Sequence, residues 1–150
     1  MVYSQSISEL AKQETNDCFV RSMAVAANLA YTEAHNLVKT LFDRKDKEGT
    51  FGVDIKLRDK QIRNTLLHQG IEVEAVNHTY YNKRSKRVLP LNVRGFYKKY
   101  NRGTYLVTTS KHAFVIKDGE IHDWEGKVPH IGRTILSGYR VKDCRQLELF

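Results

Sequence analysis

The chain has 150 residues, of which 41% are hydrophobic, so it is long enough for one domain with a substantial core but not for two. No stretch approaches the ~20 apolar residues of a membrane-spanning helix, and the N-terminus lacks the pattern of a secretory signal, so we expect a soluble, cytoplasmic protein without membrane contact. Two cysteines are too few for a disulfide framework. The formal net charge of +8 is high for this length and points to an anionic partner.

The first predicted helix begins at Cys18. Asn16 or Asp17 is suited to cap it, because their short side chains accept hydrogen bonds from the first-turn amides. From Phe19 to Ala30 only three residues are polar, which is typical of a helix inside a core. The positive end of the helix dipole favours a thiolate in the first turn, so Cys18 is a candidate nucleophile. The alternative is an inert, buried cysteine.

The polar residues 1–15 are predicted to form a loop that leads into this helix. Gln13 lies in this loop, and its side-chain amide becomes a candidate oxyanion donor if the loop folds over Cys18. Otherwise Gln13 is an exposed surface residue.

Two amphipathic helices are predicted to follow. Thr32 is expected to cap the first, whose apolar face carries Ala34, Leu37, Val38, Leu41 and Phe42. Residues 43–52 are charged and contain glycine, which predicts a loop. Residues 59–69 are predicted to form the second helix, with Asp59 as its cap and Gly70 as its left-handed stop. The inner side of this helix is predicted to carry Ile62, Leu66 and Leu67.

Residues 71–76 alternate between apolar and charged side chains and predict a half-buried strand. The basic, tyrosine-containing segment from Asn77 to Arg87 is predicted to be an exposed loop. We expect it to associate weakly with polyanions, in a salt-sensitive way and without sequence preference, because no recognised nucleic-acid motif accompanies its charges. The basic residues concerned are Lys83, Arg84, Lys86 and Arg87.

A short fourth helix is expected between Pro90 and Gly103, and after Gly103 the apolar period changes to two. Helices followed by strands predict an α+β domain. The four predicted strands form an antiparallel meander and are Thr104–Thr109, His112–Lys117, Glu120–Trp124 and Arg133–Lys142.

The dipeptide Asp118-Gly119 is a strong signal for a two-residue hairpin turn. Such a turn places His112 opposite Glu125 and diagonal to Asp123, with all three side chains on one face. Diagonal neighbours are close enough for an imidazole and a carboxylate to share a hydrogen bond.

A histidine and a carboxylate are what cysteine chemistry requires. His112 can take the proton of Cys18 and return it to the leaving group, while Asp123 fixes the tautomer and stabilises the imidazolium. Glu125 competes for this orienting role. His122 has the opposite parity along its strand and is the poorer candidate for the base.

Three sequence blocks stand out in chain order: Asp17-Cys18-x-x-Arg21-Ser22-Met23-Ala24, Gly103-x-Tyr105-Leu106-Val107 and His112-Ala113-x-x-x-x-Asp118-Gly119-x-x-x-Asp123-Trp124. With these blocks the chain resembles small papain-like cysteine peptidases found largely in bacteriophage genomes and, more distantly, the peptidase domains of bacteriocin exporters. The resemblance covers residues 13–125 in the order nucleophile, base, carboxylate. It implies a papain-like fold with a Cys18–His112–Asp123 centre, Gln13 in the oxyanion role, and a location in the cytoplasm of a phage-infected bacterium.

We therefore expect residues 1–150 to form a single papain-like domain of the α+β class, in which a helical half that carries Cys18 packs on a sheet half that carries His112 and Asp123. The expected activity is hydrolysis of an amide or isopeptide bond in a protein or peptide substrate, without a metal or cofactor.

Three alternatives to this activity remain. A papain-fold binding protein with a basic surface would bind nucleic acid or a host protein without turnover. An acyltransferase or transglutaminase-like enzyme would use the same triad with an amine in place of water. A zinc site built from Cys18, His112 and Asp123 is the least favoured, because none of the familiar ligand spacings is present.

Overall fold

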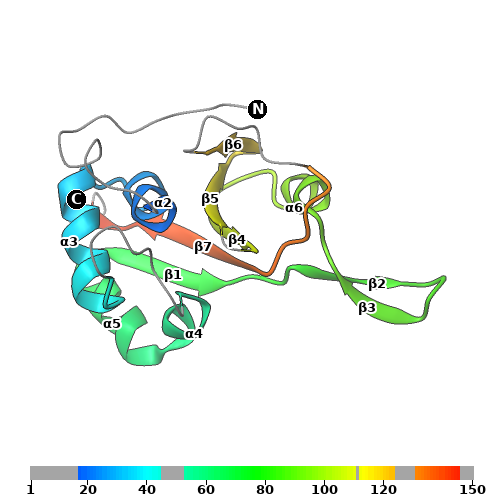
Figure 1. The fold of residues 1–150 in the computed structure, drawn as a ribbon, viewed down its shortest axis with the longest axis horizontal. Coiled ribbons are helices and arrows are strands. Elements are labelled where there is room, and N and C mark those ends of the chain that lie inside the picture. Colours follow the sequence, from blue (N-terminus) through cyan, green and yellow to red (C-terminus); the bar gives the residue numbers. More distant parts are fainter. Residues whose placement is uncertain (1–16, 45–52, 111, 124–130, 146–150) are drawn as a thin grey trace.

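The computed structural model describes residues 17–44, 53–110, 112–123 and 131–145 (Figure 1). They form helices and an antiparallel sheet, which confirms the predicted α+β class. No described helix combines the length and the apolar content that crossing a bilayer requires. The described helices are α2 (Cys18–Ala26), α3 (Tyr31–Leu41), α4 (Val53–Arg58), α5 (Lys60–His68) and α6 (Val93–Lys99). The described strands are β1 (Ile71–Ala75), β2 (Thr79–Asn82), β3 (Arg87–Pro90), β4 (Thr104–Thr109), β5 (His112–Lys117), β6 (Glu120–His122) and β7 (Ser137–Asp143).

The main sheet has five strands in the order β1-β7-β4-β5-β6, and all neighbouring strands are antiparallel. Because β7 pairs with β4 and not with β6, the predicted four-strand meander is wrong. The cause lies just before β7, where the chain is held against the start of α6. The amide of Val93 donates to the carbonyl of Arg133, and the amide of Ile135 donates to the carbonyl of Leu91. These bonds direct the chain to the edge of β4.

The two faces of β5 pack against different helices (Figure 1). Ala113 and Val115 belong to the larger core cluster, which includes most of the buried side chains of α2 and α3. Phe114 and Ile116 belong to a second cluster, which includes α6. Alternation along the strand therefore fills two cores, and β5 is held from both sides.

The local signals for α5 are confirmed. The Asp59 carboxylate accepts hydrogen bonds from the amides of Gln61 (2.8 Å) and Ile62 (3.3 Å), and Gly70 ends the helix with a φ of 82°. The prediction for Leu67 is wrong, because this side chain is 51% exposed. The cap at Thr32 is also wrong. Helix α3 begins two residues earlier than that cap requires, at Tyr31, with Ala30 in the N-cap position.

Residues 77–87 do not form the predicted loop. Strands β2 and β3 pair as an antiparallel hairpin that projects from the body of the molecule (Figure 1). Asn82 shapes the tip, because its side-chain oxygen accepts hydrogen bonds from the amides of Arg84 (2.9 Å) and Ser85 (3.0 Å). The charged residues of the segment led to the prediction of a loop, although its tyrosines and the following Val88 favour a strand.

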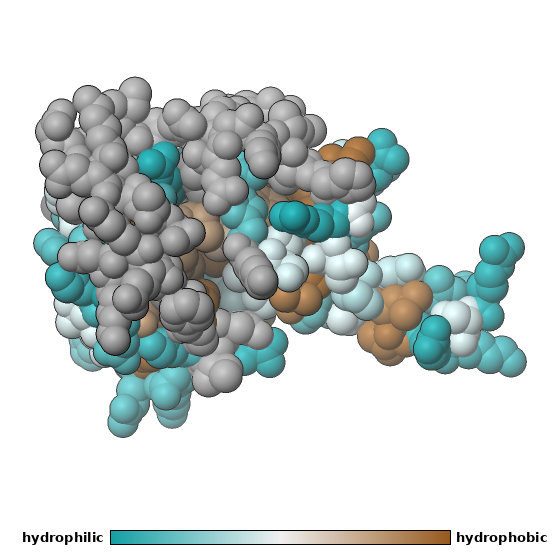
Figure 2. Space-filling model, viewed as in Figure 1, coloured by the Kyte–Doolittle hydropathy of each residue, from teal (hydrophilic) through white to brown (hydrophobic). Residues whose placement is uncertain are grey.

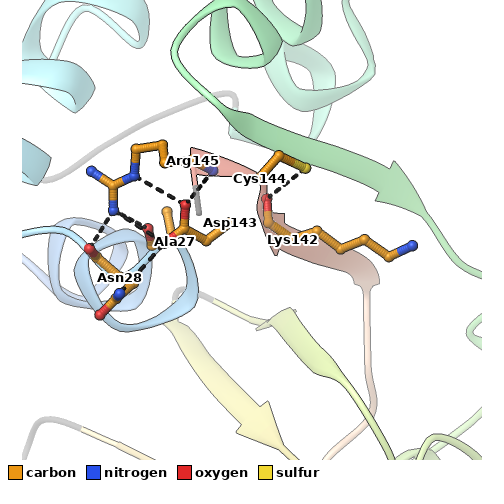
Figure 3. A network of polar contacts seen from close by, with 6 residues as sticks. All are labelled: Ala27, Asn28, Lys142, Asp143, Cys144 and Arg145. Atoms are coloured by element: carbon orange, nitrogen blue, oxygen red, sulfur yellow. Dashed lines mark hydrogen bonds and ion pairs between the residues drawn. The ribbon is translucent and has the colours of Figure 1, made fainter. Parts of the chain in front are cut away.

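The C-terminal end of α2 is tied to the end of β7 (Figure 3). The Arg145 guanidinium donates to the carbonyls of Ala27 (3.2 Å) and Asn28 (2.6 Å), which lie just beyond the last turn of α2. Asp143 holds the guanidinium in place through Nε (3.0 Å). A cation on the last carbonyls of a helix is favoured by the helix dipole, so this contact also fixes α2 relative to the sheet.

Candidate functional site

Cys18 is the first residue of α2 and is partly buried against the larger core cluster. It is not in a disulfide, and the same holds for Cys144. Ser22, one turn later, is buried and donates its hydroxyl to the carbonyl of Cys18 (2.6 Å). Cys18 therefore has the position at a helix N-terminus that the sequence predicts.

Asp17 occupies the N-cap position of α2, but its side chain does not cap the helix. Its carboxylate instead accepts hydrogen bonds from the Tyr31 hydroxyl (2.6 Å) and from Nε of Arg21 (2.9 Å). The capping prediction for Asp17 is therefore wrong, and that for Asn16 lies outside the described residues. The consequence for the site is favourable, because the carboxylate anchors the backbone before Cys18 without occupying the first-turn amides.

His112 is the first residue of β5, and Asp123 follows the last residue of β6. Ring nitrogen Nε2 of His112 lies 2.8 Å from Oδ1 of Asp123, and the Asp123 residue is only 3% exposed. The β5–β6 ladder pairs Val115 with His122 and Ile116 with Ile121, as the predicted register requires. The predicted contact between His112 and Asp123 is thus confirmed.

His112 also forms a side-chain hydrogen bond with Cys18, and these two partners determine its charge. Burial alone would lower the pKa of the imidazole, but the hydrogen bonds to Asp123 and Cys18 and the electrostatic interactions with these groups raise its pKa to about 10. Since Nε2 is engaged by Asp123, the other ring nitrogen, Nδ1, is the one left for Cys18. At neutral pH the ring is an imidazolium that donates on both sides.

Of the remaining candidates, the structure describes only His122, and this residue does not join the group. His122 lies opposite Val115, on the other face of the strand pair from His112, and burial lowers the pKa of its imidazole. Gln13 and Glu125 lie outside the described residues. The site that the structure describes is therefore the hydrogen-bonded series Cys18–His112–Asp123.

Sequence analysis missed two residues beside this series. The Tyr31 hydroxyl donates a hydrogen bond to the Asp17 carboxylate. This contact joins α3 to the residue before α2, and no local sequence pattern predicts it. Thr109 is the residue of β4 directly opposite His112, is 3% exposed, and its hydroxyl has no hydrogen-bond partner within the described part of the chain. The two-residue connection between Thr109 and His112 is a signal that would have placed them side by side.

No group of three or more histidine, cysteine, aspartate or glutamate side chains arranged to hold a metal ion occurs within the described ranges. Comparisons of the chain with protein-family models, with curated proteins and with solved structures give no match.

The elevated pKa of His112 has a measurable effect on stability. Because the pKa is about 10 in the folded protein and about 6.5 in an unfolded chain, the stabilisation from the charged ring is complete below pH 6.5 and is lost as the pH rises through 10. NMR titration of the imidazole should show His112 titrating near pH 10. In Asp123→Asn the pKa should fall, because the carboxylate partner is gone. Urea unfolding should show a smaller pH-dependent loss for this variant, and a folded wild type whose His112 titrates near pH 6.5 would contradict the assignment.

Proposed function

We propose that the protein is a papain-like cysteine hydrolase, a thiol peptidase or isopeptidase that cleaves an amide bond in a protein or peptide substrate. The observation that supports this proposal most strongly is the hydrogen-bonded series from Cys18 through His112 to Asp123. The proposal includes a papain-like fold, in which the helix of the nucleophile and the strands of the base and carboxylate belong to opposite halves of one domain. It also includes a substrate met in the cytoplasm of a phage-infected bacterium.

The proposed reaction has two halves. The Cys18 thiolate attacks the carbonyl carbon of the scissile bond, and the carbon–nitrogen bond then breaks as the His112 imidazolium gives its proton to the departing amine. The acyl group is left as a thioester on Cys18. Neutral His112 then takes a proton from a water molecule that attacks the thioester, which releases the carboxylic acid and regenerates the thiolate and the imidazolium.

Asp123 and the start of α2 provide electrostatic support for this reaction. Asp123 accepts from Nε2 of His112, which keeps the ring oriented and stabilises its charged form. In this proposal the amides of the first turn of α2 stabilise the oxyanion that develops on the attacked carbonyl. The absence of a capping hydrogen bond from the Asp17 side chain supports this role. We propose Gln13 as a second oxyanion donor on the basis of the sequence alone.

The first prediction compares the two cysteines within one protein. Cys18 should react with iodoacetamide faster than Cys144 at neutral pH, because Cys18 has a helix N-terminus and His112 as its partner. Replacement of His112 by Ala should slow alkylation of Cys18 by roughly tenfold or more, and Asp123→Ala by a smaller factor, because water partly replaces an orienting carboxylate. Mass spectrometry of each labelled cysteine measures both rates.

His122→Ala is the matched control, because it removes a neighbouring histidine on the other face of the β5–β6 pair from His112. Its alkylation rate should stay close to that of the wild type, and thermal melts should show that all variants are folded. If His122→Ala slows Cys18 as much as His112→Ala does, the assignment of the base is wrong.

The second prediction concerns the reaction itself. Incubation with a mixed peptide library should produce new peptide termini in the wild type and none in Cys18→Ser, which retains the size of the side chain but not its nucleophilicity. A parallel sample with an added primary amine separates hydrolysis from acyl transfer. If the products are peptides joined to the amine, without free new carboxyl termini, the protein is an acyltransferase and not a hydrolase. A reactive Cys18 with neither product would favour a binding protein.

A further inference from the structure

The positive charge of the chain is concentrated in one segment. Residues 75–117 contain ten of the 25 lysines and arginines and none of the 17 acidic residues. The other 15 basic residues are outnumbered by the 17 acids, so the formal charge of the chain outside this segment is −2. A segment of this length whose charged residues are all positive is typical of proteins that bind a polyanion.

The β2–β3 hairpin presents part of this charge away from the body of the molecule. Its tip and the first residue of β3 carry four exposed basic side chains, Lys83, Arg84, Lys86 and Arg87. Figure 2 shows the hairpin as a projection that is hydrophilic at its end and apolar nearer the body. A partner can therefore approach the tip without contacting the sheet.

Exposed aromatic and apolar side chains lie directly behind the charged tip. Tyr81 and Val88 are opposite each other in the ladder and are 60% and 66% exposed. Tyr80 is 43% exposed and, as the next residue of the strand, points to the other face. Large side chains left in water on both faces of a narrow ribbon are uncommon without a partner.

The base of the hairpin is fixed to α6. The Tyr100 hydroxyl donates to the carbonyl of Asn77 (2.6 Å), and the amide of Leu91 donates to the carbonyl of His78 (2.7 Å). Tyr100 in turn packs against Phe96, a buried residue of α6. The base of the hairpin is thus held by the second core cluster, and Asn82 shapes the tip, so binding requires little ordering of the backbone.

We propose that the β2–β3 hairpin is an arm that binds single-stranded nucleic acid, independently of the proposed hydrolase activity. Its four basic side chains contact phosphates, and Tyr81, with a contribution from Tyr80, stacks on unpaired bases. Proteins that bind single-stranded nucleic acid without sequence preference use cations along the sugar–phosphate backbone. They combine these with aromatic side chains that stack on any base.

Two features favour a nucleic acid over an acidic protein. Protein interfaces are depleted in charge at their core, and lysine is among the depleted residues, whereas the charged residues of 75–117 are all lysine or arginine. Protein–nucleic acid interfaces are much more positively charged than protein–protein interfaces, and phosphates match both lysine and arginine. The exposed tyrosines favour unpaired bases, because paired bases hide their faces in the stack.

The test is fluorescence anisotropy with labelled single-stranded DNA and RNA of about 20 nucleotides. This length exceeds the ~4–16 nucleotides that one OB fold covers on a single strand. Replacing the four basic residues by Gln should weaken binding at least tenfold at low salt. It should also make the slope of log K against log salt shallower by about 3, since each phosphate contact on a single strand contributes about 0.7. Tyr81→Ala should weaken binding roughly fivefold or more with an unchanged slope, and Tyr81→Phe should restore it.

The matched control removes the same charge elsewhere. Gln at Lys39, Lys60, Arg140 and Lys142, which are exposed on α3, α5 and β7, should change the affinity much less. Equal losses from the two quadruple variants would overturn the role of the hairpin. Binding to a duplex as tight as to the single strand, or competition by polyglutamate as effective as by unlabelled oligonucleotide, would overturn the assignment to single-stranded nucleic acid.

Discussion

The tight turn at Asp118 and Gly119 is the constraint on which the candidate site depends. Both residues have positive φ angles, 50° and 79°, the pattern of a two-residue turn whose twist matches that of the strands it joins. The turn is also tied to the start of β4, because the Asp118 carboxylate accepts from the amide of Gly103 (2.9 Å). It sets the register that brings His112 to Asp123, and a slip by one residue would turn His112 to the opposite face.

Stabilisation of the fold does not by itself account for the buried contact between His112 and Asp123. Removing a carboxylate from water is costly, and apolar side chains of similar volume often stabilise a core as well as an ion pair does. Two well-packed apolar clusters already hold β5 from both sides. A charged imidazole between a carboxylate and a thiol therefore suggests a chemical role, since functional sites are where such perturbed pairs gather.

Short-range patterns predicted the parts of the structure that depend on neighbours in sequence. The helix at Cys18, the cap at Asp59 and the β5–β6 register follow from capping, apolar spacing and turn chemistry. The place of β7 beside β4 could not be predicted, because it depends on backbone bonds between residues 131–135 and the start of α6. Helix α4 was not predicted, because the charged, glycine-containing segment before it is typical of a loop.

The candidate site shows the same division. Parity along two strands was enough to place His112 with Asp123, but the role of Asp17 was mispredicted. Its carboxylate turns to Tyr31, 14 residues away, and this choice depends on how α3 packs against α2. The β2–β3 hairpin was missed although its strands contain β-favouring residues, because the dense charge at the tip outweighed them.

The central claim is that Cys18, His112 and Asp123 act as one unit, and a double-mutant cycle on the alkylation rate of Cys18 tests it most directly. If Asp123 acts only through the imidazole, the double variant His112→Ala/Asp123→Ala should react about as fast as His112→Ala alone, within about twofold. Rate losses that multiply in the double variant would show that the two residues act on Cys18 separately, and would contradict the account.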